Sequence, residues 1–256
     1  MLIDTHCHIH ESDYPLDSTV VLQHAKDVGV GKMICVGTSE KSSKDAITFG
    51  GLHENIYASI GVHPHDTKDG YDIEGLFNAP RLVAVGEIGL DYFYAHSKRE
   101  IQIQALEAQI HMALAHNLPI IFHVRDAATV IQGHSVWDDF WPIIDNFHGI
   151  RGELHSFTDS QIQLENGLKR DFFIGVNGIS TFTKDEAQKA MFTSIPLSKL
   201  LLETDAPFLT PAPVRGIVNE PAFVKYVAEH HAAVRNIPLD ELAAVTAANA
   251  TVLFAL

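Results

Sequence analysis

The sequence predicts an α/β fold of the (β/α)8 TIM-barrel class, with a metal site at the C-terminal ends of the strands. Three observations lead to this prediction. Short apolar runs rich in strand formers recur at intervals of roughly 20 to 37 residues, the spacing of repeated strand–helix units. There are eight of these runs, and residues able to bind a metal follow six of them. Active sites of such barrels lie at the C-terminal ends of the strands.

The eight predicted strands are near-continuous apolar runs. This pattern is typical of strands that are buried on both faces of a parallel sheet. In chain order the runs cover residues 2–3, 33–36, 56–60, 82–85, 119–122, 152–154, 172–174 and 200–202.

The segments between the runs predict helices. Ile103, Leu106 and Ile110 continue a helical stripe through residues 98–116. An earlier stripe runs through residues 20–28, and two more helical patterns cover 221–235 and 240–254. Because no linker or low-complexity tract interrupts the pattern, we expect residues 1–256 to form one domain. An open doubly wound sheet is the less favoured alternative, since no Gly-x-Gly-x-x-Gly turn follows the first strand.

Composition limits the class of protein. The net charge of −14 argues against broad electrostatic binding of nucleic acid, although bound cations and a few arginines can reverse the sign inside a pocket. No apolar run reaches membrane-spanning length, and we see no signal peptide. Cys7 and Cys35 both lie in strand-like contexts, which favours a reducing compartment. We therefore expect a cytoplasmic protein without a membrane partner.

The residues that follow the strands carry the chemistry. His6 and His8 alternate with Cys7, so both imidazoles point to the same face of a strand and can share one metal ion. Further candidate ligands, each near the end of another apolar run, are His63, His65, Glu87, His123, His155 and Asp205.

The ligand set suggests two divalent ions rather than one. Glu87 would bridge them, with His6, His8 and Asp205 completing the first site and His123 and His155 the second. Paired ions clamp the oxygens of an ester and activate a water. Asp205 can also accept the proton of that water, so Asp205 and Glu87 are the predicted catalytic residues. The mixed nitrogen and oxygen donors suit Zn, Mn, Fe, Co or Mg.

Four more residues are candidate substrate contacts. His63 and His65 can meet a phosphate or leaving group, and a structural turn around Pro64 is the rival interpretation. Arg125 can clamp a phosphate, or it can pair with Asp91 or Asp126. Arg215 lies in the loop after the eighth strand, where barrels often bind phosphate. Glu203 shares a face with Asp205 and is a candidate to orient a ligand.

Several short motifs follow one another along the chain. They are Asp4-Thr5-His6-Cys7-His8, Gly61-Val62-His63-Pro64, Gly86-Glu87-Ile88-Gly89-Leu90-Asp91-Tyr92, His123-Val124-Arg125-Asp126-Ala127, Glu203-Thr204-Asp205-Ala206-Pro207, Arg215-Gly216 with Asn219-Glu220-Pro221, and Ala248-Asn249-Ala250 with Leu253-Phe254. Together they resemble the TatD-type metal-dependent deoxyribonucleases, part of the amidohydrolase-like group of metal TIM barrels.

The resemblance implies divalent metals and hydrolysis of phosphodiester bonds in DNA, often as a 3′-to-5′ exonuclease. It implies that His6, His8, Glu87, His123, His155 and Asp205 are the metal ligands. The sixth strand departs from the family pattern, because Ser156 and Asp159 stand where Cys and Gly are more usual. Residues 132–142 also look like a local variation beside the pocket.

The resulting functional hypothesis is a deoxyribonuclease that acts on single-stranded DNA or 3′ ends, with no obligate protein partner. The alternative is a metal-dependent hydrolase of a small-molecule amide, lactone or aminoacyl ester, because the fold alone does not fix the bond that is cleaved. A binding protein that kept the barrel is a third hypothesis, and the complete ligand set argues against it.

Overall fold

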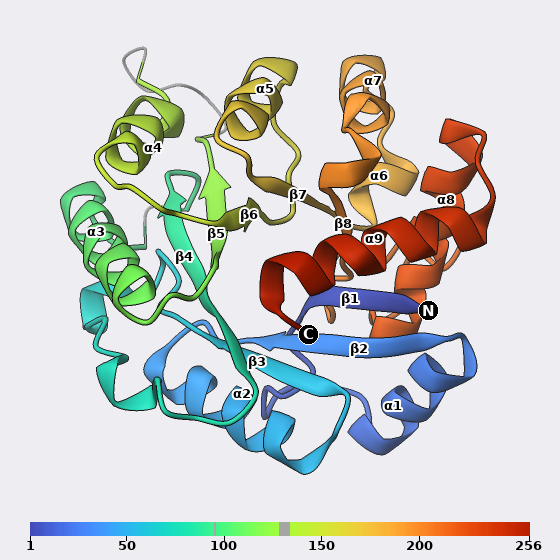
Figure 1. Ribbon diagram of the computed structural model, residues 1–256, viewed down its shortest axis with the longest axis horizontal. Helices are drawn as coiled ribbons and strands as arrows, with labels where there is room; N and C mark the ends of the chain where they lie inside the picture. Colours follow the sequence, from blue (N-terminus) through green and yellow to red (C-terminus); the bar gives the residue numbers. More distant parts are fainter. Residues whose placement is uncertain (95, 128–133) are drawn as a thin grey trace.

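The computed structural model describes residues 1–94, 96–127 and 134–256. Its strands form one parallel eight-stranded sheet in sequence order, which confirms the predicted TIM barrel (Figure 1). The strands are β1 (Leu2–Cys7), β2 (Val30–Val36), β3 (Ile56–Ile60), β4 (Leu82–Asp91), β5 (Ile120–Arg125), β6 (Gly152–Leu154), β7 (Phe173–Val176) and β8 (Leu200–Leu202).

The ring closes just beyond the end of β8. There, Cys7 and Ala206 form a parallel bridge. The amide of Asp205 donates to the carbonyl of His6 at 2.8 Å, and the amide of His8 donates to the carbonyl of Ala206 at 2.8 Å. The same hydrogen bonds bring the motifs around His6 and Asp205 together.

Strand β4 is longer than its apolar run predicts. It continues from residue 85 to Asp91, because Ile88 pairs with Phe122 and the pairing extends to Asp91 and Arg125 on β5. Glu87 therefore lies within a strand rather than after it. The sequence did not predict this extension, because the glycines at 86 and 89 interrupt the apolar run and glycine disfavours strands.

Helices surround the barrel except between β3 and β4. That connection holds two short 3₁₀ turns, η1 (Thr67–Asp69) and η2 (Glu74–Leu76), where a strict strand–helix repeat predicts an α-helix. The other helical elements are α1 (Ser18–Asp27), α2 (Glu40–Leu52), α3 (Arg99–Ala115), α4 (Val136–Asp145), α5 (Gln161–Lys169), α6 (Ile179–Phe182), α7 (Glu186–Ser194), η3 (Leu197–Lys199), η4 (Pro221–Phe223), α8 (Val224–Arg235) and α9 (Leu239–Phe254). Over the described ranges, no single helix is long and apolar enough to cross a membrane.

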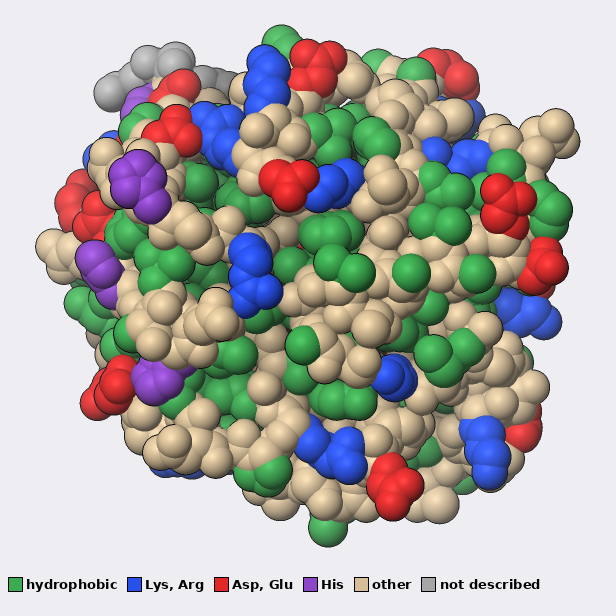
Figure 2. Space-filling view, in the orientation of Figure 1, with side chains coloured by type: hydrophobic (Ala, Val, Ile, Leu, Met, Phe, Trp, Pro, Cys, Tyr) green, Lys and Arg blue, Asp and Glu red, His purple; other side chains and the backbone are tan. Residues whose placement is uncertain are grey.

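Helix α9 covers one end of the barrel. In Figure 1 it lies across the ring of strands. Leu253 and Phe254 are buried and join an apolar cluster with strand residues such as Ile3, Ile121 and Leu201. Because β1 begins at Leu2, this is the N-terminal end of the barrel, and the opposite end is left for a site. Figure 2 shows acidic and basic side chains scattered among apolar ones on the face that α9 covers.

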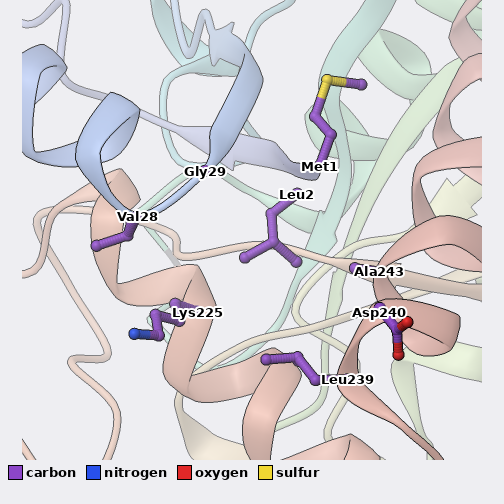
Figure 3. Close-up of a pocket in the computed structure, with 8 residues that line it drawn as sticks. All are labelled: Met1, Leu2, Val28, Gly29, Lys225, Leu239, Asp240 and Ala243. Atoms are coloured by element: carbon purple, nitrogen blue, oxygen red, sulfur yellow. The ribbon is translucent and has the colours of Figure 1, made fainter.

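A shallow groove of about 450 Å³ lies at the start of β1 (Figure 3). Leu2, Val28 and Leu239 give it an apolar lining, and Met1 and Lys225 stand at its sides. It lies at the opposite end of β1 from His6 and carries none of the predicted ligands.

Candidate metal centre

The histidines at the end of β1 face each other. His6 is fully buried and His8 nearly so, and their Nε2 atoms are 3.2 Å apart. Nδ1 of His8 lies 2.9 Å from the carbonyl oxygen of Val36, which can only accept, so this nitrogen carries the proton. In the neutral ring, Nε2 of His8 then presents a lone pair.

A second facing pair comes from β5 and from the residue after β6. Nδ1 of His123 and Nε2 of His155 are 3.1 Å apart. Nε2 of His123 lies 3.0 Å from Oδ2 of Asp91, which holds that proton on the far side of the ring. In the neutral ring, Nδ1 of His123 carries a lone pair that points at His155.

These distances fit donors that share an ion. Two donors about 2.1 Å from one ion, at tetrahedral or octahedral angles, lie roughly 3.0–3.4 Å apart. Both facing pairs satisfy this condition. The donor set of imidazoles and carboxylates also suits a divalent ion.

Glu87 lies between the two pairs. Its Oε2 is 2.8 Å from Nε2 of His155 and 3.3 Å from Nδ1 of His123, and its Oε1 is 3.8 Å from Nε2 of His8. Asp205 approaches only the first pair, with its Oδ1 3.3 Å from Nε2 of His8 and 3.7 Å from that of His6. The six predicted ligands thus meet in one cluster, with Glu87 at its centre.

Burial and charge set the protonation of the cluster. Burial lowers the pKa of His6 well below its usual value, so its ring is neutral at neutral pH. Burial alone would raise the pKa of Glu87, but the nearby histidines, His155 first, hold it well below its usual range. Glu87 is therefore an anion among neutral or cationic rings.

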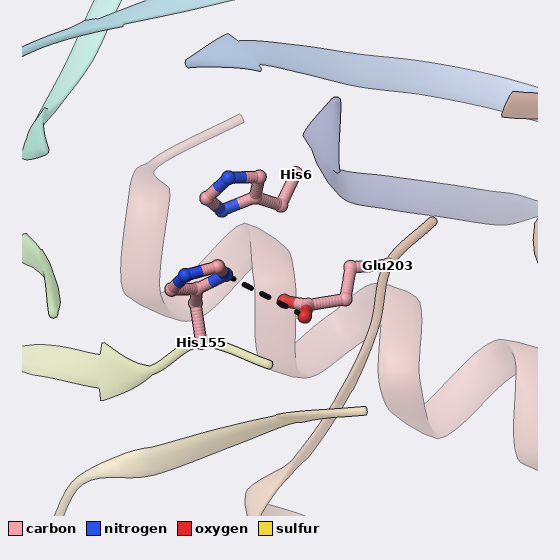
Figure 4. A group of neighbouring side chains, drawn as sticks. All are labelled: His6, His155 and Glu203. Atoms are coloured by element: carbon pink, nitrogen blue, oxygen red, sulfur yellow. Dashed lines mark ion pairs between the residues drawn. The ribbon is translucent and has the colours of Figure 1, made fainter. Parts of the chain in front are cut away.

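Glu203 lies beside His155 (Figure 4). The rings of His6 and His155 stack at 4.0 Å between centroids, and Oε1 of Glu203 is 3.7 Å from Nδ1 of His155. The amide of Ser156 donates to the same oxygen at 2.7 Å, and Nδ2 of Asn177 lies 3.3 Å from it. Glu203 is fixed beside the far nitrogen of a candidate ligand.

Glu153 is a buried acidic residue next to the cluster that the sequence did not single out. It is fully buried, and neither of its carboxylate oxygens has a protein hydrogen-bond partner within the described ranges. Burial, reinforced by the charge of Glu203, raises the pKa of Glu153 well above its usual range, so it is protonated at neutral pH. The available signal was its position two residues before His155, on the same face of a strand.

The two histidines of the β3–β4 connection lie beside the cluster. His63, Glu87 and His123 offer ligand atoms within 4.8 Å of one another. Nε2 of His65 is 3.0 Å from Oδ2 of Asp91, the atom that also faces His123. Asp91 is thus the common anchor of His65 and His123, a role that the sequence did not indicate.

Arg125 makes a contact that the sequence did not predict. Instead of an ion pair with Asp91 or Asp126, its guanidinium lies over the ring of Phe93, 4.2 Å from the centroid, and 5.0 Å from that of Tyr94. The two carboxylates are engaged by other donors, since Asp91 faces histidines and Asp126 accepts from the amide of residue 136 at 3.0 Å.

Arg215 is held by the loop after β8 and by α6. It donates to the carbonyl of Thr210 at 2.8 Å and lies over Phe182 at 3.8 Å. Within the described part of the chain, these contacts tie it to α6 and the loop after β8. Of the variable stretch 132–142, residues 132 and 133 lie outside the described residues, and Ser135 caps α4.

Comparison with known proteins gives matches along the whole chain. Residues 3–255 match the family model described as TatD related DNase. A relative named uncharacterized metal-dependent hydrolase YabD, from Bacillus subtilis strain 168, is 36% identical over 261 residues, which cover 99% of each chain. A relative named 3′-5′ ssDNA/RNA exonuclease TatD, from Erwinia amylovora, is 30% identical over 270 residues, which cover 100% of each chain.

A solved structure is similar over the same extent. The crystal structure of YJJV, a TatD homolog from Escherichia coli K12, superposes with a TM-score of 0.88 at 29% sequence identity. The match covers 100% of this chain and 98% of the other.

Proposed function

This chain belongs to the TatD-related DNase family of metal-dependent hydrolases, and from that premise we propose that it is a 3′-to-5′ exonuclease of single-stranded DNA. The observation that carries the proposal is the buried meeting of His6, His8, His123 and His155 around Glu87. The name of the Erwinia relative supports the choice of substrate.

Two divalent ions, Mg, Mn, Zn, Fe or Co, would occupy the cluster. His6, His8 and Asp205 would hold one, His123 and His155 the other, and Glu87 would contact both. Such ions supply Lewis acidity to phosphate oxygens and to a water. The remaining steps belong to the side chains of the chain itself.

Asp205 is the residue that we assign to proton transfer. It is the most exposed carboxylate of the cluster, at 15% of its side chain, so it can reach a water between the cluster and a substrate. Its φ of 57° is left-handed, a conformation that Asp and Asn tolerate better than most residues. The hydrogen bond from its amide to His6 fixes the carboxylate over the ligands.

Other residues position the ligands and the substrate. Glu203, 3.7 Å from Nδ1 of His155, would orient that ring, and Asp91 holds the proton of His123 away from the cluster. His63 and His65, at the edge of the cluster, would contact the scissile phosphate.

The test is hydrolysis of a 5′-labelled single-stranded DNA with added Mg²⁺ or Mn²⁺. Wild-type protein should shorten the strand from its 3′ end, and Asp205→Asn should lower the rate about 100-fold or more, the usual effect of losing a general base. Asparagine keeps the left-handed backbone, so the variant isolates the carboxylate.

Asp171→Asn is the matched control and should keep full activity, because Asp171 is an exposed aspartate with a similar left-handed backbone (φ 64°) just before β7, at the opposite end of the barrel. If metal-loaded wild-type protein cleaves no DNA but does hydrolyse small amides, lactones or aminoacyl esters, the nuclease proposal is wrong and the alternative hydrolase is correct.

A further inference from the structure

Three exposed aromatic side chains stand on loops that follow strands β4 and β8. Phe93 is 41%, Tyr94 50% and Phe208 61% exposed. The other large exposed hydrophobic side chains of the described ranges are aliphatic or methionine. We call these three residues the aromatic rim.

The aromatic rim is attached to the candidate metal centre on both sides. Oδ1 of Asp91 accepts from the amides of Phe93 at 2.9 Å and Tyr94 at 3.2 Å, while its Oδ2 faces His123. The amide of Phe208 donates to the carbonyl of Asp205 at 2.8 Å. Each part of the rim is therefore fixed by a residue that belongs to the cluster or contacts it.

Strand order places the two parts of the rim on opposite sides of the barrel mouth. Strands β4 and β8 are four places apart in a ring of eight, so their following loops face each other across the centre. The ligand cluster lies between them, because its members come from β1, β4 and β5 and from the residues after β6 and β8. An extended ligand that crosses the mouth of the barrel would therefore pass over the cluster, with a residue of the aromatic rim at each side.

We propose that the aromatic rim is a base-stacking subsite, in which Phe93 and Tyr94 hold one base of a single-stranded nucleic acid and Phe208 holds the other, with the intervening phosphate over the cluster. Every base has a π-face, so such a subsite tolerates any sequence and requires unpaired bases. Arg125, stacked against Phe93, would place a positive charge beside the phosphate backbone of the bound nucleic acid.

Charge supports this occupant over duplex DNA. The chain carries a net charge of −14, which opposes the many phosphate contacts that duplex binding uses. Stacking supplies affinity that does not depend on a large positive surface. The inference rests on the proposed function and names the features of the substrate that the site reads.

The test measures binding rather than cleavage. Asp205→Asn protein with Mn²⁺ is titrated with a 5′-fluorescein-labelled single strand and with the same strand carrying abasic residues at its last two 3′ positions. Fluorescence anisotropy should give a Kd at least about fivefold lower for the intact strand, as expected for a stacked base. Adding Phe208→Ala should bring the two Kd values closer together, and Phe208→Trp should restore the difference.

Ile162→Ala, which truncates an exposed side chain on α5, is the matched control and should preserve the difference. Phe93→Leu is a second rim variant, and circular dichroism checks the fold of each protein. Equal Kd values for intact and abasic strands, or a difference that the rim variants leave unchanged, would overturn the subsite. Because cleavage is not measured, failure of the proposed exonuclease activity is detected separately, in the wild-type hydrolysis assay.

Discussion

Two imidazoles of the candidate metal centre are oriented by hydrogen bonds at their far nitrogens, and a third has a carboxylate nearby. The carbonyl of Val36 orients His8, Asp91 orients His123, and Glu203 approaches His155. Partners of this kind fix the tautomer and increase the basicity of the ligand nitrogen. The metal affinity of the site therefore depends on residues that contact no ion.

Glu203→Gln tests this dependence. The amide keeps the shape of the side chain but loses the negative charge beside His155, so metal affinity should fall roughly 10- to 100-fold. Competition with a chromophoric chelator measures the affinity. Glu165→Gln is the control, because Glu165 is exposed on α5 and its side chain hydrogen-bonds only to Gln161 among the described contacts. An unchanged metal affinity in Glu203→Gln would show that the charge of Glu203 does not contribute to metal binding.

Single residues also mark where sequence reasoning reached its limit. The meeting of the six candidate ligands was predictable, because each lies near the end of an apolar run in the sequence. The anchoring of His65 and His123 by Asp91 was not, since it depends on contacts between residues 26 and 32 positions apart. The stacking of Arg125 on Phe93 depends on which rotamer the arginine adopts, and the sequence offered two carboxylates as competing partners.

At the scale of elements, a carboxylate joins three of them. Asp139 on α4 accepts from the hydroxyl of Tyr92, after β4, at 2.6 Å and from Nε of Arg99 on α3 at 2.6 Å. Burial works in the opposite direction, but the hydrogen bonds, that of Arg99 first, lower the pKa of Asp139 to about 2 from an ordinary value of 3.8. The lowered pKa means that the ionised form stabilises the fold.

The stabilisation has a defined pH range. A carboxyl group with a lowered pKa in the folded state contributes fully above its unfolded pKa of 3.8 and loses its contribution as pH falls through about 2. Asp139→Asn should therefore cost about 1 kcal/mol at neutral pH, a value reduced for the partial exposure of Arg99. The cost should shrink as pH falls below about 4.

Urea unfolding of both proteins across this pH range measures the effect, with Asp13→Asn as the control. A constant difference at every pH would mean that shape, not charge, accounts for the role of Asp139.

Element types were predictable where burial is strong and less so where it is weak. The eight strands were predictable from their apolar runs, because strands that are buried on both faces of a parallel sheet are apolar throughout. The segment between β3 and β4 was expected to complete a strand–helix unit and instead forms two 3₁₀ turns. Pro64, Gly70 and Pro80 interrupt it, and these residues disfavour a continuous helix.

At the scale of the whole molecule, the candidate metal centre joins distant parts of the barrel. Its donors come from β1, β4 and β5 and from the residues after β6 and β8. Ions that bind these donors in the folded state stabilise it, and the stabilisation grows with their affinity and concentration.

Metal removal should therefore lower the thermal stability. Dialysis against a chelator should reduce Tm by roughly 5–15 °C, the range expected for a few kcal/mol in a chain of this size, and added Mn²⁺ or Zn²⁺ should restore it. Differential scanning calorimetry measures both changes. The same treatment of the His6→Ala variant should change Tm by less. If the Tm of the wild-type protein does not change when metal is removed or added, tight metal binding at this cluster is excluded.

Helix α9 has a consequence for engineering the protein. Its apolar face and the ligand cluster occupy opposite ends of the same strands, so the two can be redesigned in separate steps. Libraries that vary the loops around Phe93 and Phe208 would explore new specificities, while substitutions around Leu253 would supply the stability margin that such libraries consume. The end of the barrel that α9 covers and the end that carries the candidate metal centre can therefore be changed independently.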